Sequence, residues 1–319
     1  MGITTTLSSS LVEKVIREDE IPARNQLFPL ETVLSVFRYG APVASTIQRH
    51  DKIESGLGHA KTLISEHEES GRSFPSGLVI TANELTGGQG RFHRYWHAPA
   101  GGLWMTVVMV NTLLPASSVL YSLAPGVAAC ETICEDIPEA RLKWVNDVHI
   151  GGRKICGVLV ETMRGPVSGE EYVMLGIGIN INNSKFPEDL AALAVSYKQL
   201  LDIEMNVNRL TARLLARLSW NIGLLHYEEE LILAEHGRDA LADPTLMAEV
   251  LGEREHMLVH SWKQLSDTVG RRVLFGQNVQ EKPQFEATVK DIAADGLLVL
   301  ELDDGSVVSE NSGEITYLD

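Results

Sequence analysis

The feature that most constrains the fold is a succession of three short β-rich stretches in the middle of the chain. They cover residues 141–144, 154–163 and 172–181. Turn residues, such as the Gly151-Gly152 pair, bound each stretch, and this pattern is typical of strands joined by tight connections. Two further apolar runs, at residues 77–81 and 103–110, have the same character. The middle of the chain therefore predicts a β-sheet.

Helical segments accompany these strands. Ser117 and Ser118 offer an N-cap to an apolar helix, and Asn206 offers an N-cap to a long amphipathic helix with leucines at helical spacing. Residues 45–70 are mostly polar with a helical pattern. Residues 1–40 can form one or two helices but are short for an independent domain. We therefore expect helices before, between and after the strands.

The length of 319 residues exceeds a typical domain of about 100–200 residues. Beyond Asp267, short β-like runs alternate with Gly and Asp turns, as expected for a small all-β barrel. We predict an α+β protein in four parts. They are an N-terminal extension (1–40), a main domain (41–227), a helical connector or insertion (228–266) and a C-terminal β domain (267–319).

The charge balance limits the classes of partner. The chain has 27 basic and 43 acidic residues and a formal net charge of −16. This charge repels nucleic-acid phosphates and anionic membrane surfaces, so we expect neither partner. The segment 91–154 nevertheless collects six basic residues, which makes it the better place for an anionic ligand.

Neither secretion nor membrane spanning is indicated. No run of about 18 apolar residues occurs, and the first ten residues lack the charged-then-apolar pattern of a signal peptide. The three cysteines, Cys130, Cys134 and Cys156, show no Cys/His ligand spacing. The simplest interpretation is three reduced thiols in a cytoplasmic protein.

The first stretch that carries chemistry is residues 87–96, Gly-Gly-Gln-Gly-Arg-Phe-His-Arg-Tyr-Trp, which follows an apolar strand. Glycines let backbone N–H groups approach anionic oxygens, and Arg91 and Arg94 can add charge-assisted contacts. The pattern suits a phosphate, although a mobile surface loop has the same composition. It matches neither the P-loop nor the dinucleotide-binding pattern, which argues against those folds.

The second stretch joins residues 143–147, Lys-Trp-Val-Asn-Asp, to residues 151–161 across a glycine turn. A turn between two strands places Asn146, Asp147 and Lys154 near strand ends, where polar groups can converge on a ligand. A plain β-hairpin with ordinary turn residues is the alternative.

The third stretch is residues 176–182, Gly-Ile-Gly-Ile-Asn-Ile-Asn. Glycines in a strand leave room for a ligand to lie against the backbone, and asparagine amides can both donate and accept hydrogen bonds at the edge of a heterocycle. A bulged core strand is the alternative.

Taken together and in this order, the three stretches resemble the catalytic domain of biotin protein ligases, in the biotin/lipoate A/B protein ligase family. Residues 154–161, Lys-Ile-Cys-Gly-Val-Leu-Val-Glu, and residues 176–182 match the family pattern closely. The resemblance covers roughly residues 40–225 and 265–319, including Ser45-Thr46 upstream and a Gly-Glu-Ile motif at residues 313–315. It implies a class II synthetase-like mixed sheet flanked by helices, with an SH3-like barrel at the C-terminus. We expect the DNA-binding domain of the repressor-type ligases to be lacking.

The resemblance also implies an activity, namely ATP-dependent formation of biotinyl-5'-AMP and transfer of biotin to a lysine of a carrier protein. Lys154 would contact the carboxylate of the acid and the α-phosphate. Arg91 would order the loop, Asp147 would orient the attacking amine and Lys143 would support the phosphate. Further substrate-binding positions would be Ser45, Thr46, Leu85, Gly88, Gly90, Arg94, Trp96, Asn146, Gly157, Gly176, Gly178 and Asn180.

The chain departs from the family pattern at four positions. Leu85 replaces a glutamine that helps to hold the biotin ring, and Gln89 replaces an arginine that steadies the closed loop. His93 stands where the family has glycine, and Val145 stands where it has proline. These exchanges bear on the identity of the acid and on activity.

Two other interpretations of the same residues follow. The acid can be lipoate or octanoate on the same fold, or the chain can be a catalytically weakened protein that binds an acyl-adenylate. ATP chemistry implies Mg²⁺, while no metal-ligand motif is present. The expected partner is a biotin carboxyl carrier protein or a similar lysine-bearing domain, and the expected state is a monomer or homodimer.

Overall fold

A seven-stranded sheet forms the main body of the protein. The computed structural model describes residues 6–237 and 255–318, and its larger sheet has the strand order β1-β2-β3-β7-β6-β5-β4. Only β1 and β2 run parallel, whereas the other neighbours are antiparallel. The strands are β1 (Thr46–Ile53), β2 (Leu78–Leu85), β3 (Leu103–Val110), β4 (Arg141–Lys143), β5 (Asp147–Ile150), β6 (Arg153–Arg164) and β7 (Glu171–Ile179).

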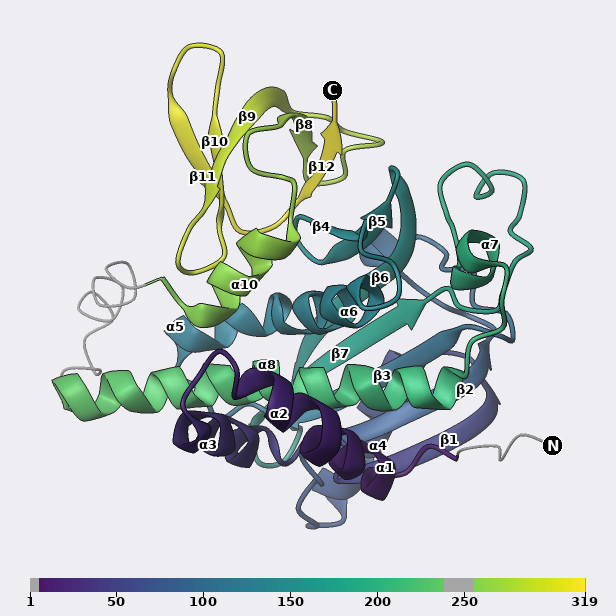
Figure 1. The fold of residues 1–319 in the computed structure, drawn as a ribbon, viewed down its shortest axis with the longest axis vertical. Coiled ribbons are helices and arrows are strands. Elements are labelled where there is room, and N and C mark those ends of the chain that lie inside the picture. Colours follow the sequence, from purple (N-terminus) through teal and green to yellow (C-terminus); the bar gives the residue numbers. More distant parts are fainter. Residues whose placement is uncertain (1–5, 238–254, 319) are drawn as a thin grey trace.

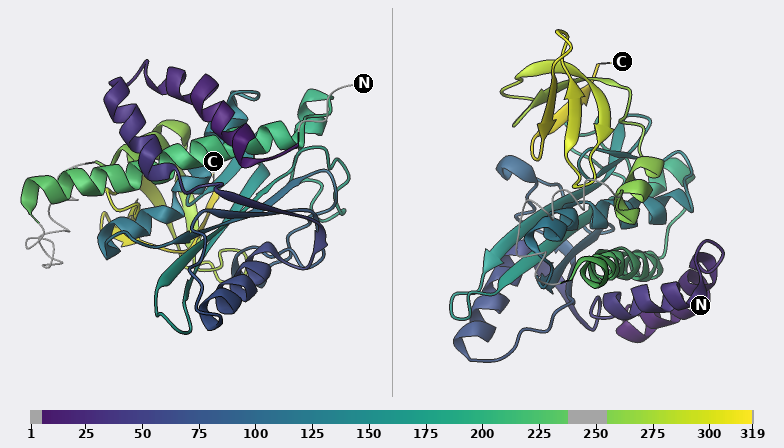
Figure 2. Two further views of the ribbon diagram at one scale, coloured as in Figure 1. Left: turned by 90° about the horizontal axis from the view of Figure 1, so that it is seen from below. Right: turned by 90° about the vertical axis from the view of Figure 1, so that its left-hand side faces the viewer.

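Helices cover both faces of this sheet (Figure 2). On one face lie α6 (Ala124–Cys134) and the long α8 (Val207–His236), which share a large apolar core with the strands, and the short α5 (Pro115–Ser118) precedes α6. On the other face, α4 (Gly56–Glu69) covers a smaller apolar cluster that includes Ile64, Leu78 and Met174. The short α7 (Tyr197–Leu201) follows β7. Because α4 is short, it leaves part of the second face uncovered by helix.

The N-terminal residues form helices that pack on the outer side of α8 (Figure 1). They are α1 (Ser9–Val15), a π-helical turn (Ile16–Glu20), α2 (Ile21–Arg24) and α3 (Leu30–Gly40). A network of ion pairs holds them. Arg217 on α8 binds Glu20 at 2.9 Å, and Arg24 binds Glu131 on α6 through two hydrogen bonds of 2.9 Å.

A second, five-stranded sheet lies at one end of the molecule, after α10 (Met257–Leu265) (Figure 1). Its order is β11-β10-β9-β8-β12, and every neighbouring pair is antiparallel. The strands are β8 (Arg272–Gly276), β9 (Phe285–Ile292), β10 (Leu298–Glu301), β11 (Val307–Glu310) and β12 (Glu314–Tyr317). The α+β class, with a mixed main sheet and a small C-terminal β domain, is thus confirmed.

Three local predictions need correction. Residues 46–53, expected to be helical, form the edge strand β1, and helix α4 begins only at Gly56. Ser117 and Ser118 cap no helix, because the segment breaks into α5, a 3-10 turn (Val119–Ser122) and α6. Strand β5 was not predicted. Asn206 does cap α8, since its side chain accepts a hydrogen bond from the backbone N–H of Arg209 at 3.1 Å.

The predicted domain boundaries stay predictions. Helix α8 continues across the boundary predicted at residue 227. Residues 238–254 of the predicted connector lie outside the described residues.

Candidate active site

The part of the sheet that α4 leaves uncovered is the floor of a cavity of about 670 Å³. Residues opposite one another on neighbouring antiparallel strands point to the same face, so the strand pairing defines the floor. One row consists of Ala82, Trp104, Gly178 and Gly157. The next row, two residues further along the strands, consists of Ile80, Thr106, Gly176 and Leu159. All eight residues line the cavity.

At three positions of this floor, glycines leave the backbone uncovered by a side chain of their own. A Cβ at Gly176 would lie 3.1 Å from the carbonyl oxygen of Leu159 and 3.4 Å from Leu57 of α4. Gly157 and Gly178 are directly paired, and the indole of Trp96 lies on them. A Cβ at Gly178 would be 2.7 Å from Nε1 of Trp96. The glycines predicted to admit a ligand therefore lie side by side beneath the cavity.

The Gly/Arg loop forms one wall and is folded as a small hairpin. The N–H of Trp96 donates to the carbonyl of Gly88 at 2.9 Å, and the N–H of Gly90 donates to the carbonyl of Arg94 at 2.8 Å. Gly88 lies behind the cavity rather than in its lining, and a Cβ there would approach the Trp96 carbonyl to 2.5 Å. Its role is to let the two arms of the loop come together.

The two arginines of the loop face the C-terminal domain and the cavity. Arg94 forms an ion pair with Glu314 at the start of β12. Burial lowers the pKa of Arg91, while the carboxylates of Glu314 and Asp147 act in the opposite direction. Both guanidinium groups flank the ring of Phe92, at 5.2 and 5.5 Å from its centroid. The loop thus brings two cations to the mouth of the cavity.

Lys154 and Asp147 form the charged centre of the site. Nζ of Lys154 lies 2.7 Å from Oδ2 of Asp147 and 5.3 Å from the ring centroid of Trp96. Nε2 of His149 lies 4.0 Å from the same Asp147 oxygen. Burial alone would raise the pKa of Asp147, but the charge of Lys154 and hydrogen bonding from the neighbouring His149 and Lys154 side chains outweigh it and hold that pKa well below its usual range. Asp147 is therefore a stable anion and a poor proton acceptor.

Three further predicted residues reach the cavity from strand ends. Lys143 lies 5.2 Å from the ring centroid of Tyr317, and burial lowers its pKa. The buried Asn146 donates from its amide to the carbonyl of Ser122 at 3.0 Å. The amide oxygen of Asn180 accepts from Asn183 at 2.9 Å. These contacts fix the orientation of both asparagines in the wall.

The structure does not bring Ser45 and Thr46 to the cavity. They lie at the start of β1, where Thr46 pairs with Leu78, whereas the cavity lies at the other end, where Ile53 pairs with Leu85. Seven residue steps along a strand are about 23 Å. A different serine, Ser55, lines the cavity and caps α4 by accepting from the N–H of Gly58 at 3.2 Å. Ser55 was not predicted from the sequence, and the signal that could have identified it is a serine in N-cap position directly before the helical pattern of α4.

Three of the four departures from the family pattern lie at the cavity, and the side chain of the fourth, His93, lies outside the described part of the structure. Leu85, Gln89 and Val145 all line the cavity. The C-terminal domain also contributes lining residues that sequence reasoning missed, namely Val279, Gln280, Ile315 and Thr316. Cys156 is fully buried, and burial raises the pKa of its thiol, which opposes a role as a nucleophile.

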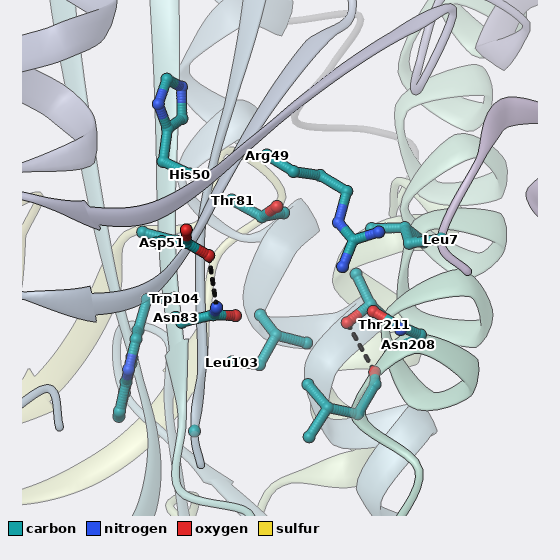
Figure 3. Close-up of a pocket in the computed structure, with 13 residues that line it drawn as sticks. Leu7, Arg49, His50, Asp51, Thr81, Asn83, Leu103, Trp104, Asn208 and Thr211 are labelled. Atoms are coloured by element: carbon teal, nitrogen blue, oxygen red, sulfur yellow. Dashed lines mark hydrogen bonds between the residues drawn. The ribbon is translucent and has the colours of Figure 1, made fainter. Parts of the chain in front are cut away.

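A smaller cavity of about 220 Å³ lies between β1 and the start of α8 (Figure 3). Asn83 donates to Asp51 there at 3.2 Å, and Arg49 extends toward Thr211, while His50 points away. Its lining combines both signs of charge without convergent groups, so it carries less chemical information than the larger cavity.

The larger cavity can hold an elongated anionic ligand. A short chain can lie along the floor beside the Trp96 indole, which covers Gly157 and Gly178, and its charged end can reach Lys154, Arg91 and Lys143. Asp147 can hold a cationic group next to that end. The arrangement thus suits the joining of an anion and an amine.

Two family models match the chain. The model of the biotin/lipoate A/B protein ligase family matches residues 60–182, and that of the biotin protein ligase C-terminal domain matches residues 268–316. The bifunctional ligase/repressor BirA of Bacillus subtilis (strain 168) is 32% identical over 154 residues, which are 47% of this chain and 45% of BirA. The biotin–[acetyl-CoA-carboxylase] ligase of Mycobacterium tuberculosis is 33% identical over 153 residues, 46% of this chain and 54% of that protein. The matched part spans about half the length of these relatives.

Solved structures share the fold. The biotin protein ligase from Aquifex aeolicus in complex with biotin and ATP has a TM-score of 0.58 and 20% identity, and the match covers 86% of this chain and 98% of that one. The R40G mutant of the same ligase in complex with biotin has a TM-score of 0.59 and 19% identity, with the same coverage. Across the described part of the chain, the helices are too short or too polar to cross a membrane.

Proposed function

Because the chain belongs to the biotin/lipoate A/B protein ligase family and carries a biotin protein ligase C-terminal domain over residues 268–316, we propose that it is a biotin protein ligase. The enzyme forms biotinyl-5'-AMP from biotin and ATP and transfers the biotinyl group to a lysine of a carrier protein. The observation that carries this proposal is the glycine-floored cavity with the Lys154–Asp147 pair at its charged end.

In the first half-reaction, a carboxylate oxygen of biotin attacks the α-phosphorus of ATP. A bond from that oxygen to phosphorus forms, the bond from the α-phosphorus to the bridging oxygen breaks, and pyrophosphate leaves. Lys154 binds both the carboxylate and the α-phosphate, and so reduces their mutual repulsion. Arg91 and Arg94 hold the phosphates from the loop, and Lys143 supports them from β4. Trp96 and Asn180 contact the adenylate.

In the second half-reaction, the amine of the carrier lysine attacks the carbonyl carbon of the anhydride. An amide bond forms, the bond from carbon to the phosphate oxygen breaks and AMP leaves, while the proton lost by the amine nitrogen passes to the departing phosphate or to solvent. Asp147 orients the incoming amine, because its low pKa keeps it anionic and able to accept a hydrogen bond. Asn146 lies at the same strand end and lines the same wall.

Mg²⁺ enters with ATP in this proposal. Among residues 6–237 and 255–318, there is no group of three or more His, Cys, Asp or Glu side chains that could hold a metal. Mg²⁺ usually keeps several waters and binds to phosphate oxygens, where it neutralises their charge. The protein cations therefore act on a nucleotide that already carries its metal.

The decisive experiment is acid-dependent release of pyrophosphate, measured with ATP, stoichiometric enzyme and no carrier. Biotin is expected to give one equivalent, and lipoate and octanoate much less. Release with lipoate or octanoate alone would change the identity of the acid, and no release with any acid would favour an acyl-adenylate-binding protein. Transfer is then followed to a biotin carboxyl carrier domain, with a Lys→Arg carrier as control.

Three further properties belong to this proposal. The acceptor is a lysine-bearing carrier domain rather than a nucleic acid. The three cysteines form no disulfide, which supports a reducing, cytoplasmic location. The enzyme is a monomer or a homodimer, which light scattering distinguishes.

A further inference from the structure

The inner end of the cavity, away from Lys154, is lined mainly by apolar side chains. Ile80 and Leu159 occupy the ends of the inner floor row, and Leu57 of α4 covers it. Beyond this row, the apolar cluster under α4 fills the space. A ligand whose carboxylate is at Lys154 therefore places its far end in an apolar recess.

Thr106 is the polar exception in this row. Thr106 is only 3% exposed, and it lies between Ile80 on β2 and Gly176 on β7. Within residues 6–237 and 255–318, its hydroxyl makes no hydrogen bond, and its oxygen is not fully enclosed by protein but reaches the cavity. Solvent in the cavity can hydrogen-bond to such a hydroxyl, but a ligand that excludes the solvent leaves it buried and unsatisfied, which is costly, unless the ligand itself offers a hydrogen bond.

The neighbouring chain leaves this hydroxyl open to the cavity. A Cβ at Gly56, the first residue of α4, would lie only 2.5 Å from Oγ1 of Thr106. Glycine at position 56 therefore gives the Thr106 hydroxyl its space, and glycine at position 176 leaves the floor beside it without a side chain, under Leu57 of α4. Both glycines thus keep a hydrogen-bonding group accessible at the bottom of an apolar recess.

The position of Thr106 also sets a distance from the charged end. The Gly157–Gly178 row lies beside Lys154, since a Cβ at Gly157 would be 2.9 Å from Cε of that lysine. The Thr106 row is two residues further along the strands, which is about 7 Å. A ligand that touches both ends has a carboxylate, a short alkyl chain and a head group.

We propose that the Thr106 hydroxyl recognises the head group of the acid by a hydrogen bond, and so selects an acid with a polar ring over a plain hydrocarbon acid. This inference rests on the proposed ligase function and names the specificity determinant of the same site. A cyclic urea offers both N–H donors and a carbonyl acceptor, and the flanking apolar side chains contact its ring. Octanoate satisfies the apolar recess but leaves the hydroxyl without a partner.

The selection arises because the Thr106 hydroxyl is left without a hydrogen-bond partner when a plain hydrocarbon acid is bound. A site built to hydrogen-bond its substrate discriminates strongly against an analogue that lacks the group, because the protein side is then left buried and unsatisfied. Thr106→Val removes the hydroxyl and keeps the shape. We expect it to lower kcat/KM for biotin between about 10-fold and about 100-fold, mainly through KM, and to leave or raise the rate with octanoate.

The test is the pyrophosphate assay with biotin, dethiobiotin and octanoate on the full chain. Dethiobiotin keeps the cyclic urea and lacks the sulfur, so its rate should fall in parallel with that of biotin. Thr106→Ser should restore selectivity because it restores a hydroxyl. Thr81→Val is the matched control, since Thr81 lies on the neighbouring strand, binds the carbonyl of Gln48 at 3.4 Å and lines the smaller cavity instead.

The outcomes separate this inference from the proposed function. If the wild type releases pyrophosphate with none of the acids, the proposed function fails. If the wild type prefers biotin and Thr106→Val keeps the same biotin-to-octanoate ratio, the ligase function stands and the role of Thr106 is overturned. Thermal melting of each variant identifies loss of folding, and KM for ATP should stay unchanged in Thr106→Val.

Discussion

Among single residues, Lys154 and Asp147 form an ion pair. In the proposed mechanism, Lys154 acts in adenylate formation and Asp147 acts in transfer to the amine. Without a ligand, the cation and the carboxylate are 2.7 Å apart and neutralise each other. In this proposed mechanism, a bound carboxylate and phosphate compete for the same ammonium group, which frees Asp147 for the incoming amine. The proposal therefore predicts that the adenylate forms before the amine binds at Asp147.

Replacing Lys154 with alanine should lower acid-dependent pyrophosphate release by about 100-fold to about 1,000-fold, because one donor aimed at developing charge contributes that much. Lys61→Ala is the control, since Lys61 forms an exposed ion pair with Glu161 at 2.7 Å. Normal release by Lys154→Ala, with a normal melting temperature, would remove this residue from the mechanism.

Replacing Gly178 with alanine should displace Trp96. The new Cβ would lie 2.7 Å from Nε1 of the indole, and such overpacking costs about 1–3 kcal/mol if the ring stays in place. We expect changed tryptophan emission and weaker activity in a folded protein. Gly58→Ala is the control, because a Cβ there meets only the Ser55 side chain at 3.5 Å. If the emission change also occurs in Trp96→Phe/Gly178→Ala, another tryptophan reports it.

At the scale of elements, strands buried on both faces were predictable and the edge strand was not. Strand β3 is apolar almost throughout and was predicted with its observed bounds, residues 103–110. Strand β1 pairs on one side only, so Arg49, Asp51 and Lys52 are exposed there and hide its strand character. The wrong placement of Ser45 and Thr46 follows from this, because the cavity lies at the end of a strand that was read as helix.

Helix α4 binds the turn between β6 and β7 through one carboxylate. Glu68 accepts hydrogen bonds from the N–H groups of Val167 and Ser168, at 3.2 and 2.7 Å, and from the hydroxyls of Ser168 and Tyr172. The bond from Tyr172 contributes most, followed by those from Ser168, and together they lower the pKa of Glu68 from 4.5 to about 2. The ionised carboxylate of Glu68 thus holds helix α4 to the turn between β6 and β7.

The stability due to Glu68 should therefore depend on pH. A depressed pKa stabilises the fold fully above 4.5, and this stabilisation is lost as the pH falls toward 2. The melting temperature of Glu68→Gln should be lower than that of the wild type at pH 7, and the difference should shrink between pH 4.5 and 2. Glu69→Gln, at an exposed neighbour, should show no such trend. A difference independent of pH would contradict the assignment.

At the scale of the whole molecule, buried ion pairs attach the N-terminal helices to the body. Arg217 contacts Glu20 at 2.9 Å, Glu135 at 2.6 Å and the carbonyl of Glu131 at 2.9 Å, and its side chain is 14% exposed. Arg217→Met leaves Glu20 buried without this partner and should lower the free energy of unfolding by about 3 kcal/mol. Arg17→Met, which breaks an exposed pair with Glu18, should change it by less than about 1 kcal/mol. Urea denaturation measures both, and equal effects would show that the network adds little.

The sequence predicted the motif residues of the site better than its walls. Lys154, Asp147 and the glycines lie in short segments whose pattern is local. Ile315 and Thr316, by contrast, enter the cavity because a second domain folds against the first, and the Gly-Glu-Ile motif at residues 313–315 supports the resemblance without indicating that contact. Likewise, Thr106 looks like any residue of an apolar strand until the strand pairing places it beside Gly176.

The paired strands beneath the cavity also determine where this chain can gain or lose residues. Strands β2, β3, β7 and β6 are paired without any shift in register over the floor. Since side chains alternate between faces, inserting or deleting one residue in any of them would turn the glycines and Thr106 away from the cavity and bring core side chains into it. The exposed turn at residues 303–305, between β10 and β11, has no such constraint. Insertions and deletions should therefore be tolerated in such turns, whereas the strands of the floor should keep a fixed number of residues.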